Sequence, residues 1–420
     1  MSPSGGAKAA RRAAAAAAAA GAAASATVNS VVDALTGASD VPADDAHQER
    51  AAGADEPSVP SAAPAEATTS AESSEAVEPA AEKKRTEHAE HAEPTEHAEH
   101  PATTGYGTPA TDACSVQWDQ DGTSAYGTAA TARFFVCVEQ PGPWGRDAAR
   151  ESHLDRDLGA ELDARTSRAG GRFMLVRRPG GHPAHDGPRH VLVAHAGARP
   201  DEAWLLTAEV DDVGDLLGLD WGALARGSQA LVQASLLGSR PTAPTLLVCT
   251  NGRRDVCCAV RGRPLAAHAA RVAPGRAWEV SHTGGHRFAP TAVLLPWGQT
   301  LARLDEPASE WVLAASESGH LPAELLGPLH DRGRSGVPGV SQCAESHVRA
   351  ETGETRIAAL WADQPEASDE GWEVIVTHAD GRRWRVGVTR EPVGRTRPES
   401  CGKKAIEVME HRASILEAWF

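Results

Sequence analysis

Aromatic side chains, long hydrophobic runs and closely spaced cysteine pairs are scarce in this 420-residue sequence, and each shortage argues against a class of protein. It holds 2 Tyr, 5 Phe and 3 Met, and no apolar run approaches the roughly 18 residues that a membrane helix needs. Seven cysteines, an odd number in which Cys257 and Cys258 are adjacent, do not suit a secreted disulfide framework and favour a reducing, cytoplasmic location. The 57 acidic side chains outnumber the 41 basic ones, which argues against binding nucleic acid through its phosphates. We therefore expect a soluble protein with no nucleic-acid partner and no membrane partner.

The first 110 residues contain no Trp, Phe or Cys. All 11 Trp, 5 Phe and 7 Cys follow residue 110, whereas residues 1–110 carry 17 acidic and 7 basic side chains. Such a segment cannot bury enough apolar surface to offset its chain entropy. We predict a disordered Ala/Glu/His-rich tail over residues 1–110.

Beyond the tail, short apolar runs alternate with helical patterns, and this order predicts an α/β layer structure. Residues 111–239 are expected to form an N-terminal α/β part. Residues 240–306 show the order strand, loop, helix, strand, strand, strand, which is that of a small α/β sandwich of thioredoxin-like size. The expected strands are 133–138, 173–176, 190–195, 204–209, 245–249 and 277–280, and a hairpin is expected around Gly298. The helix of the second unit is expected over 264–272, with Pro264 at its start.

The C-terminal third is predicted to be helical with one β-hairpin. In residues 307–402 we expect helices over 307–331 and 338–352, and then two strands joined through Asp380-Gly381. Residues 403–420 are expected to be a C-terminal tail helix, with its helical pattern over 405–419.

The densest chemical signal covers 38 residues and contains Cys249, Cys257, Cys258, His282 and His286. Two thiolates and two imidazoles make a full set of four ligands for zinc or for an iron–sulfur cluster. Structural zinc sites usually use Cys-x2–4-Cys pairs, whereas seven or eight residues separate these cysteines. The spacing is easier to reconcile with a wider site that spans two metal ions.

The residues between these ligands have roles that suit such a site. Cys249 ends a buried strand, and Asp255 can cap the helical turn that carries Cys258. Gly284 and Gly285 permit a backbone path that returns His286 to the side of His282.

Two long runs identify a resemblance. The run C-T-N-G-R-R-D-V-C-C-A-V-R-G-R-P at 249–264 and the run W-E-V-S-H-T-G-G-H-R-F-A-P at 278–290 resemble the sucrase/ferredoxin-like family of thioredoxin-like ferredoxins, with supporting matches at 139–147 and 332–335. The resemblance covers residues 112–402. It implies a [2Fe–2S] cluster on a thioredoxin-like fold, bound by Cys249, Cys258, His282 and His286. A Cys-x7-Cys interpretation would place Cys257 on iron instead of Cys258, and the family pattern favours Cys258.

The implied ligand set has electrochemical consequences. Two neutral imidazoles in place of two thiolates make the site less negative, so its reduction potential should lie above that of an all-cysteine ferredoxin. A histidine ligand also keeps one ring nitrogen free to titrate, which predicts a pH-dependent potential. The other cysteines, Cys114, Cys137, Cys343 and Cys401, are expected to be small buried residues or free thiols.

We expect a non-enzymatic protein of electron transfer or redox sensing that works with a redox partner protein or reductase. Sucrose cleavage is not supported, because no convincing pair of carboxylates accompanies the site. One alternative is a thiol oxidoreductase that uses Cys257 and Cys258, and another is a structural zinc protein with the same four ligands. The nearby arginines form either a docking rim for an acidic partner or a solvated polar face: Arg253, Arg254, Arg261, Arg263 and Arg287.

Overall fold

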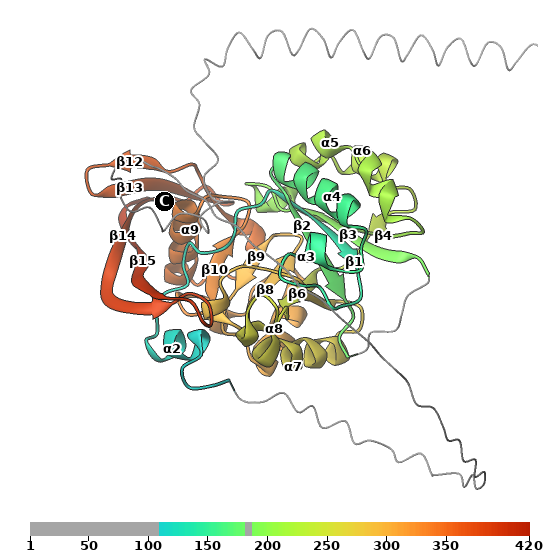
Figure 1. Ribbon diagram of the computed structural model, residues 1–420. Helices are drawn as coiled ribbons and strands as arrows, with labels where there is room; N and C mark the ends of the chain where they lie inside the picture. The colour runs from blue at the N-terminus through green and yellow to red at the C-terminus, as the bar shows by residue number, and fades with distance from the viewer. Residues whose placement is uncertain (1–108, 181–186) are drawn as a thin grey trace, which may run out of the picture. The chain divides into compact units, whose positions relative to one another are not determined.

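The computed structural model describes residues 109–180 and 187–420. Within these ranges the chain forms two β-sheets with helices packed on them, which confirms the α/β class (Figure 1). The tail expected over residues 1–110 falls outside the described residues, apart from its last two positions.

The larger sheet has the strand order β10-β9-β8-β6-β7-β2-β1-β3-β4-β5, and it consists of two halves with one internal pattern. In each half two parallel strands, β1 with β2 or β6 with β7, lie beside two antiparallel ones, β3 and β4 or β8 and β9. Antiparallel pairing of β2 with β7 joins the halves. The order expected for residues 240–306 is therefore present, and the first half repeats it. The strands are β1 (Phe134–Glu139), β2 (Arg172–Arg177), β3 (Arg189–His195), β4 (Trp204–Val210), β5 (Arg240–Pro241), β6 (Thr245–Cys249), β7 (Ala277–Val280), β8 (Ala292–Leu295), β9 (Gln299–Leu301) and β10 (Asp331–Arg334).

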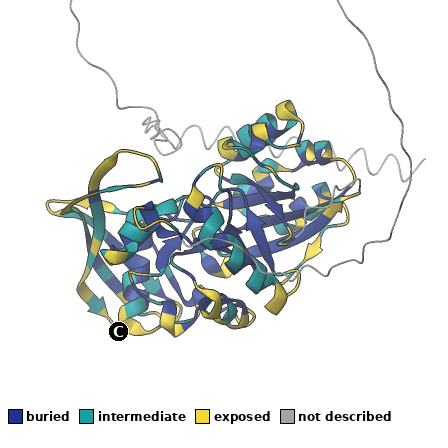
Figure 2. Cartoon of the chain, turned by 60° about the horizontal axis from the view of Figure 1, so that its bottom comes forward, coloured by how far each residue is buried: buried dark blue, intermediate teal, exposed yellow. Residues whose placement is uncertain are grey.

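Helices cover one face of each half, and the two remaining faces share an apolar cluster. Apolar residues of β1 to β4 pack beneath the helices of the first half, and those of β6 to β9 pack beneath the helices of the second. A third cluster contains side chains from both halves, among them Leu192 and Leu247. Figure 2 shows these strands as buried and the outer helix faces as exposed. The helices are α3 (Ala148–Glu151), α4 (Arg156–Arg168), α5 (Trp221–Arg226) and α6 (Gln229–Ser235) in the first half, and α7 (Val256–Val272) and α8 (Glu306–Ser316) in the second.

Helix α7 begins eight residues before the expected position. Pro264 marks the predicted start, but the helix begins at Val256 because the Asp255 carboxylate caps it by accepting a hydrogen bond from the N–H of Cys257, 2.9 Å away. The helix lies close against the end of β6, since a Cβ at Gly262 would overlap the carbonyl oxygen of Cys249. The cap and the close packing fix the direction in which the first turn points.

The smaller sheet contains β11 (Leu360–Ala362), β12 (Glu366–Ser368), β13 (Gly371–His378), β14 (Arg383–Pro398) and β15 (Ala405–Trp419), and helix α9 (Gly339–Thr352) packs on it. The hairpin through Asp380-Gly381 is present as expected. The helix predicted over 405–419 is wrong, because this segment pairs along most of β14 and so satisfies backbone groups that an unpaired edge would expose. The helix predicted over 307–331 ends at Ser316, and only a short 3-10 turn, Ala323–Leu325, follows it.

Candidate functional site

Four residues of the predicted ligand set meet at one edge of the second half-sheet, and we call them the histidine–cysteine group: Cys249, Cys258, His282 and His286. Cys249 is the last residue of β6, and Cys258 lies in the first turn of α7. His282 follows β7, and His286 begins the short turn His286–Phe288. Because β6 and β7 are parallel neighbours, both chain segments leave the sheet at the same edge.

The side chains of the histidine–cysteine group form a chain of contacts that runs from Cys249 to His282. Cys249 and Cys258 are buried and share a hydrogen bond. The Cys258 Sγ lies 3.5 Å from the His286 Nδ1. The rings of His286 and His282 stack, with centroids 5.0 Å apart, and both are half-buried. The structure therefore brings all four predicted ligands together.

Burial and hydrogen bonds shift the pKa values of these four side chains in directions that favour metal binding. The hydrogen bond from Cys258, together with those from Thr283 and Asn251, lowers the pKa of Cys249 to about 7 against the opposing effect of burial, while the same bond raises the pKa of Cys258. Burial lowers the pKa of His286 to about 4, and burial also lowers the pKa of His282 well below its ordinary value. At neutral pH the group thus offers two uncharged imidazoles and one readily formed thiolate.

Two arginines from other strands hold the loop that carries the histidines. Arg332 of β10 donates to the carbonyl of Gly284 at 2.9 Å and to the carbonyl of Thr128. Arg172 of β2 donates to the carbonyls of His282 and Thr283, both at 3.3 Å. Gly284 and Gly285 have φ of 81° and 69°, the left-handed conformation that their place in the turn requires. Arg172 is not among the residues predicted for the site, and no spacing signal in the sequence links it to the loop.

A second set of potential ligands lies on the other side of the same helical turn, and we call it the three-cysteine group: Cys114, Asp255, Cys257 and Cys401. Their ligand atoms all lie within 4.8 Å of one another. The Cys257 Sγ is 3.6 Å from the Cys114 Sγ and 3.2 Å from the Cys401 Sγ. The Cys114 and Cys401 sulfurs are 3.6 Å apart. Cys114 begins helix α2 (Cys114–Gln120), and Cys401 lies in the turn between β14 and β15.

Asp255 connects the three-cysteine group by hydrogen bonds. Its carboxylate accepts from the Ser400 hydroxyl at 2.7 Å, from the N–H of Cys401 at 2.8 Å and from the N–H of Cys257 at 2.9 Å. Burial works to raise its pKa, but these bonds outweigh burial and the pKa lies below its ordinary value. The carboxylate is therefore charged and fixed in direction at neutral pH.

The three-cysteine group adds a contact that the sequence did not indicate, and it separates the vicinal cysteines. Cys114 and Cys401 are free cysteines, as expected, but both lie against Cys257, a proximity that spacings of 143 and 144 residues do not reveal. Cys137 and Cys343 do lie in apolar clusters, as expected. Cys257 and Cys258 have different sulfur partners, so the arrangement does not favour a dithiol function for that pair.

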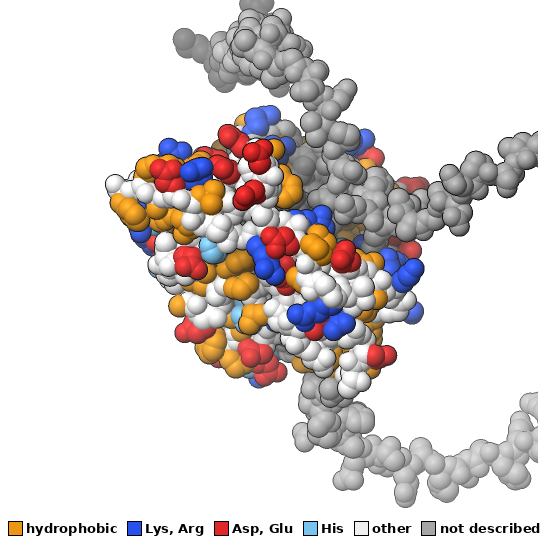
Figure 3. Space-filling model, turned by 90° about the vertical axis from the view of Figure 1, so that its left-hand side faces the viewer, with side chains coloured by type: hydrophobic (Ala, Val, Ile, Leu, Met, Phe, Trp, Pro, Cys, Tyr) orange, Lys and Arg blue, Asp and Glu red, His pale blue; other side chains and the backbone are white. Residues whose placement is uncertain are grey.

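Two of the arginines around these loops form ion pairs with neighbouring segments. Arg261 pairs with Asp119 at 2.6 Å, and Arg287 pairs with Glu399 at 3.1 Å, so both tie neighbouring segments together. Arg253 is exposed. On the face shown in Figure 3 acidic and basic side chains are interspersed.

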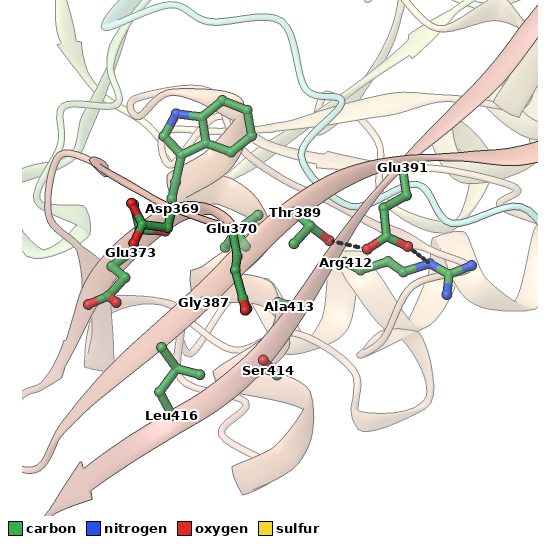
Figure 4. Close-up of a pocket in the computed structure, with 13 residues that line it drawn as sticks. Asp369, Glu370, Glu373, Gly387, Thr389, Glu391, Arg412, Ala413, Ser414 and Leu416 are labelled. Carbon is green, nitrogen blue, oxygen red and sulfur yellow. Dashed lines mark hydrogen bonds and ion pairs between the residues drawn. The ribbon is translucent and has the colours of Figure 1, made fainter.

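A groove in the smaller sheet is separate from both sulfur groups. It lies along β13, β14 and β15, between residues such as Trp372, Glu373 and Leu416 (Figure 4). Glu391 at its rim accepts a hydrogen bond from Thr389 and pairs with Arg412, so these polar groups are already engaged. The lining contains no cysteine or histidine.

Comparison with known proteins supports part of the resemblance. Residues 125–320 match a family model described as sucrase/ferredoxin-like. No curated protein and no solved structure matches the chain. The matched span contains the whole histidine–cysteine group, whereas Cys114 and Cys401 lie outside it. Among the described residues, no helix combines the length and the apolar character that crossing a membrane requires.

Proposed function

The chain carries a sucrase/ferredoxin-like region at residues 125–320, and we propose that this region binds a [2Fe–2S] cluster through the histidine–cysteine group and serves in electron transfer or redox sensing. The observation that carries the proposal is the convergence of Cys249, Cys258, His282 and His286 at one sheet edge. When bound, such a cluster supplies one-electron transfer.

The donor set of the histidine–cysteine group fits this cofactor. Its four side chains are soft or borderline donors, and their protonation at neutral pH leaves both imidazoles free to bind metal. The buried cysteines lie on the inner side, and the half-buried histidines lie nearer to solvent. We infer that an electron enters or leaves on the histidine side, where less protein intervenes.

The supporting arginines have an electrostatic role in the proposal. Burial lowers the pKa of Arg332 to about 9, with further lowering by Arg287 and Arg172, so this guanidinium is still charged at neutral pH. Positive charge beside the ligands stabilises the reduced, more negative state and raises the reduction potential. Exposed Arg253 is the position at which we expect an acidic redox partner or reductase to dock. A cytoplasmic location is part of the same proposal.

The test is the visible absorption and electron paramagnetic resonance spectrum of the anaerobically purified protein, with iron and sulfide assays. We expect about two irons and two sulfides per chain. Cys258→Ser should abolish the colour, and His286→Ala should abolish it or shift it to the blue. Cys257→Ser is the matched control, since its sulfur faces the other group, and it should keep the colour.

Two results would overturn the proposal. A colourless protein with zinc on His282 and His286 would make the histidine–cysteine group a structural zinc site, because zinc is d¹⁰ and colourless. Loss of colour in Cys257→Ser together with its retention in Cys258→Ser would exchange the ligand assignment.

A further inference from the structure

We propose that the three-cysteine group binds a single zinc ion, with Cys114, Cys257 and Cys401 as thiolate ligands and the Asp255 carboxylate as the fourth ligand. This site is distinct from the histidine–cysteine group and goes beyond the proposed function, since neither Cys114 nor Cys401 lies in the span that matches the family model.

The sulfur positions match one metal ion. Three sulfurs separated by 3.2, 3.6 and 3.6 Å form a triangle whose corners lie about 2.0 Å from its centre. An ion at the usual zinc–sulfur distance of about 2.3 Å from each sulfur therefore sits about 1 Å above that plane. A regular tetrahedral site needs sulfurs about 3.8 Å apart, so the two longer separations have to open by about 0.2 Å and the shortest by about 0.6 Å.

The same distances argue against a second iron–sulfur cluster. The protein ligands of a [2Fe–2S] cluster are shared between two irons, so three of its cysteine sulfurs cannot all lie within 3.6 Å of one another. A mononuclear ion that prefers sulfur in tetrahedral geometry suits the arrangement, and zinc is the common ion of this kind.

Asp255 is oriented to complete the tetrahedron. Its Oδ2 and Oδ1 lie 3.7 and 3.9 Å from the Cys114 Sγ, close to the separation of about 3.5 Å between an oxygen and a sulfur ligand of one zinc ion. The Oδ2 already accepts two hydrogen bonds, from Ser400 and Cys401, whereas the Oδ1 accepts one, from the N–H of Cys257. The Oδ1 thus keeps a lone pair for the metal, and the hydrogen bonds hold the carboxylate as supporting groups do in zinc sites.

A contrast within the chain distinguishes this group from ordinary buried thiols. Cys137 and Cys343 each lie among apolar side chains, where a cysteine acts as a small hydrophobic residue. In the three-cysteine group the sulfurs lie against each other and against a carboxylate whose hydrogen-bond partners are uncharged. A divalent cation would compensate this concentration of acidic groups.

The ion would fasten three distant parts of the chain together. Helix α2, the first turn of α7 and the turn between β14 and β15 supply one sulfur each, from residues 143 and 144 positions apart. We expect a structural site.

The test measures zinc and iron per chain in the full-length protein, together with zinc-edge X-ray absorption of the wild type. We expect about one zinc with three sulfur neighbours and one oxygen neighbour. Cys401→Ser should lose this zinc and keep its iron and visible absorption. Cys343→Ser, the matched control, should keep both metals.

Three outcomes would overturn the zinc site: nitrogen in place of sulfur among the zinc neighbours, unchanged zinc content in Cys401→Ser, or a Cys257–Cys401 disulfide in the unreduced protein by mass spectrometry. If Cys401→Ser does not fold, the zinc-edge X-ray absorption spectrum of the wild type alone tests whether zinc has three sulfur neighbours. Failure of the iron–sulfur proposal is recognised separately, because it removes iron and colour while the zinc with three sulfur neighbours remains.

Discussion

The two sulfur groups begin at consecutive residues of one helical turn, but they are assembled in opposite ways. The histidine–cysteine group draws Cys249, Cys258 and both histidines from a 38-residue stretch, at adjacent strand ends. The three-cysteine group draws Cys114 and Cys401 from beyond both ends of the family-matched span. Successive residues of a helix point about 100° apart, so Cys257 and Cys258 necessarily face different surroundings. The difference teaches that local spacing reveals a site only where the ligands are close in sequence.

The two halves of the larger sheet make a related point about fold and function. The strand β1 ends in Glu139 where the corresponding strand β6 ends in Cys249. The first half therefore has the same parallel pair and the same helical connection, but not the cysteine. The strand order supplies the edge, and the residues placed there supply the chemistry.

The largest predicted effect disturbs both groups at once, because the variant displaces helix α7, which carries a cysteine of each group. In Gly262→Ala the new methyl group would overlap the Cys249 carbonyl oxygen, so α7 has to move away from β6. We expect a loss of about 3 kcal/mol in the free energy of unfolding, and lower iron and zinc contents together. Denaturant titration and metal analysis measure both quantities. Gly218→Ala, at a position with open space, is the control; unchanged metal contents in Gly262→Ala would show that the helix is not held this closely.

The next prediction concerns a hydrogen bond that stabilises the histidine–cysteine group and not the three-cysteine group. Arg332→Gln deletes the charged donor to the carbonyl of Gly284 and weakens the histidine loop, at a cost of about 2 kcal/mol. We expect a lower iron content and, in the molecules that retain the cluster, a lower reduction potential, because a buried positive charge is lost. Zinc content should not change.

Arg303→Gln is the reciprocal variant for the three-cysteine group. Arg303 pairs with Asp119 at 2.8 Å and donates to the carbonyls of Trp118 and Thr123, so it anchors the end of helix α2. We expect weaker zinc retention on dialysis against a chelator, with iron unaffected. A variant of either arginine that lost both metals equally would contradict the independence of the two groups.

A smaller effect distinguishes the groups by pH. Burial lowers the pKa of His282 and His286, so neither ring is an imidazolium at neutral pH. A cluster iron bound at one ring nitrogen would leave the remaining proton on the other nitrogen. Reduction makes that proton bind more tightly, so the potential should fall by up to about 59 mV per pH unit as the pH rises. His286→Cys should reduce the slope, whereas Cys401→Ser should keep it. A potential that stays flat from about pH 6 to about pH 10 would contradict histidine ligation.

A structural feature could be predicted from the sequence where it depends on neighbouring residues. It could not be predicted where it depends on contacts between residues that are far apart in the sequence. The alternation of short apolar runs gave most of the strands of the larger sheet, and the role of Asp255 as a helix cap is confirmed, because both depend on neighbouring residues. Residues 405–419 were assigned to a helix because their long-range pairing with β14 is not visible in their own composition. Arg172 and Arg332 are more than 45 positions in the sequence from the histidine-loop carbonyls that they contact. Cys114 is likewise distant from Cys257, so these contacts follow from the tertiary fold alone.

The smallest predicted effect concerns the cysteines that belong to neither group. Cys137 lies on β1 within the apolar cluster that both halves of the larger sheet share, and it is a buried free cysteine. Cys137→Ala removes one buried sulfur, so we expect a loss of about 1 kcal/mol in the free energy of unfolding with iron, zinc and colour unchanged. Thermal unfolding and metal analysis check this together. If Cys137→Ala lost either metal while remaining folded, burial of any thiol would be enough to disturb the sites, and the contacts that distinguish the two groups would not explain their chemistry.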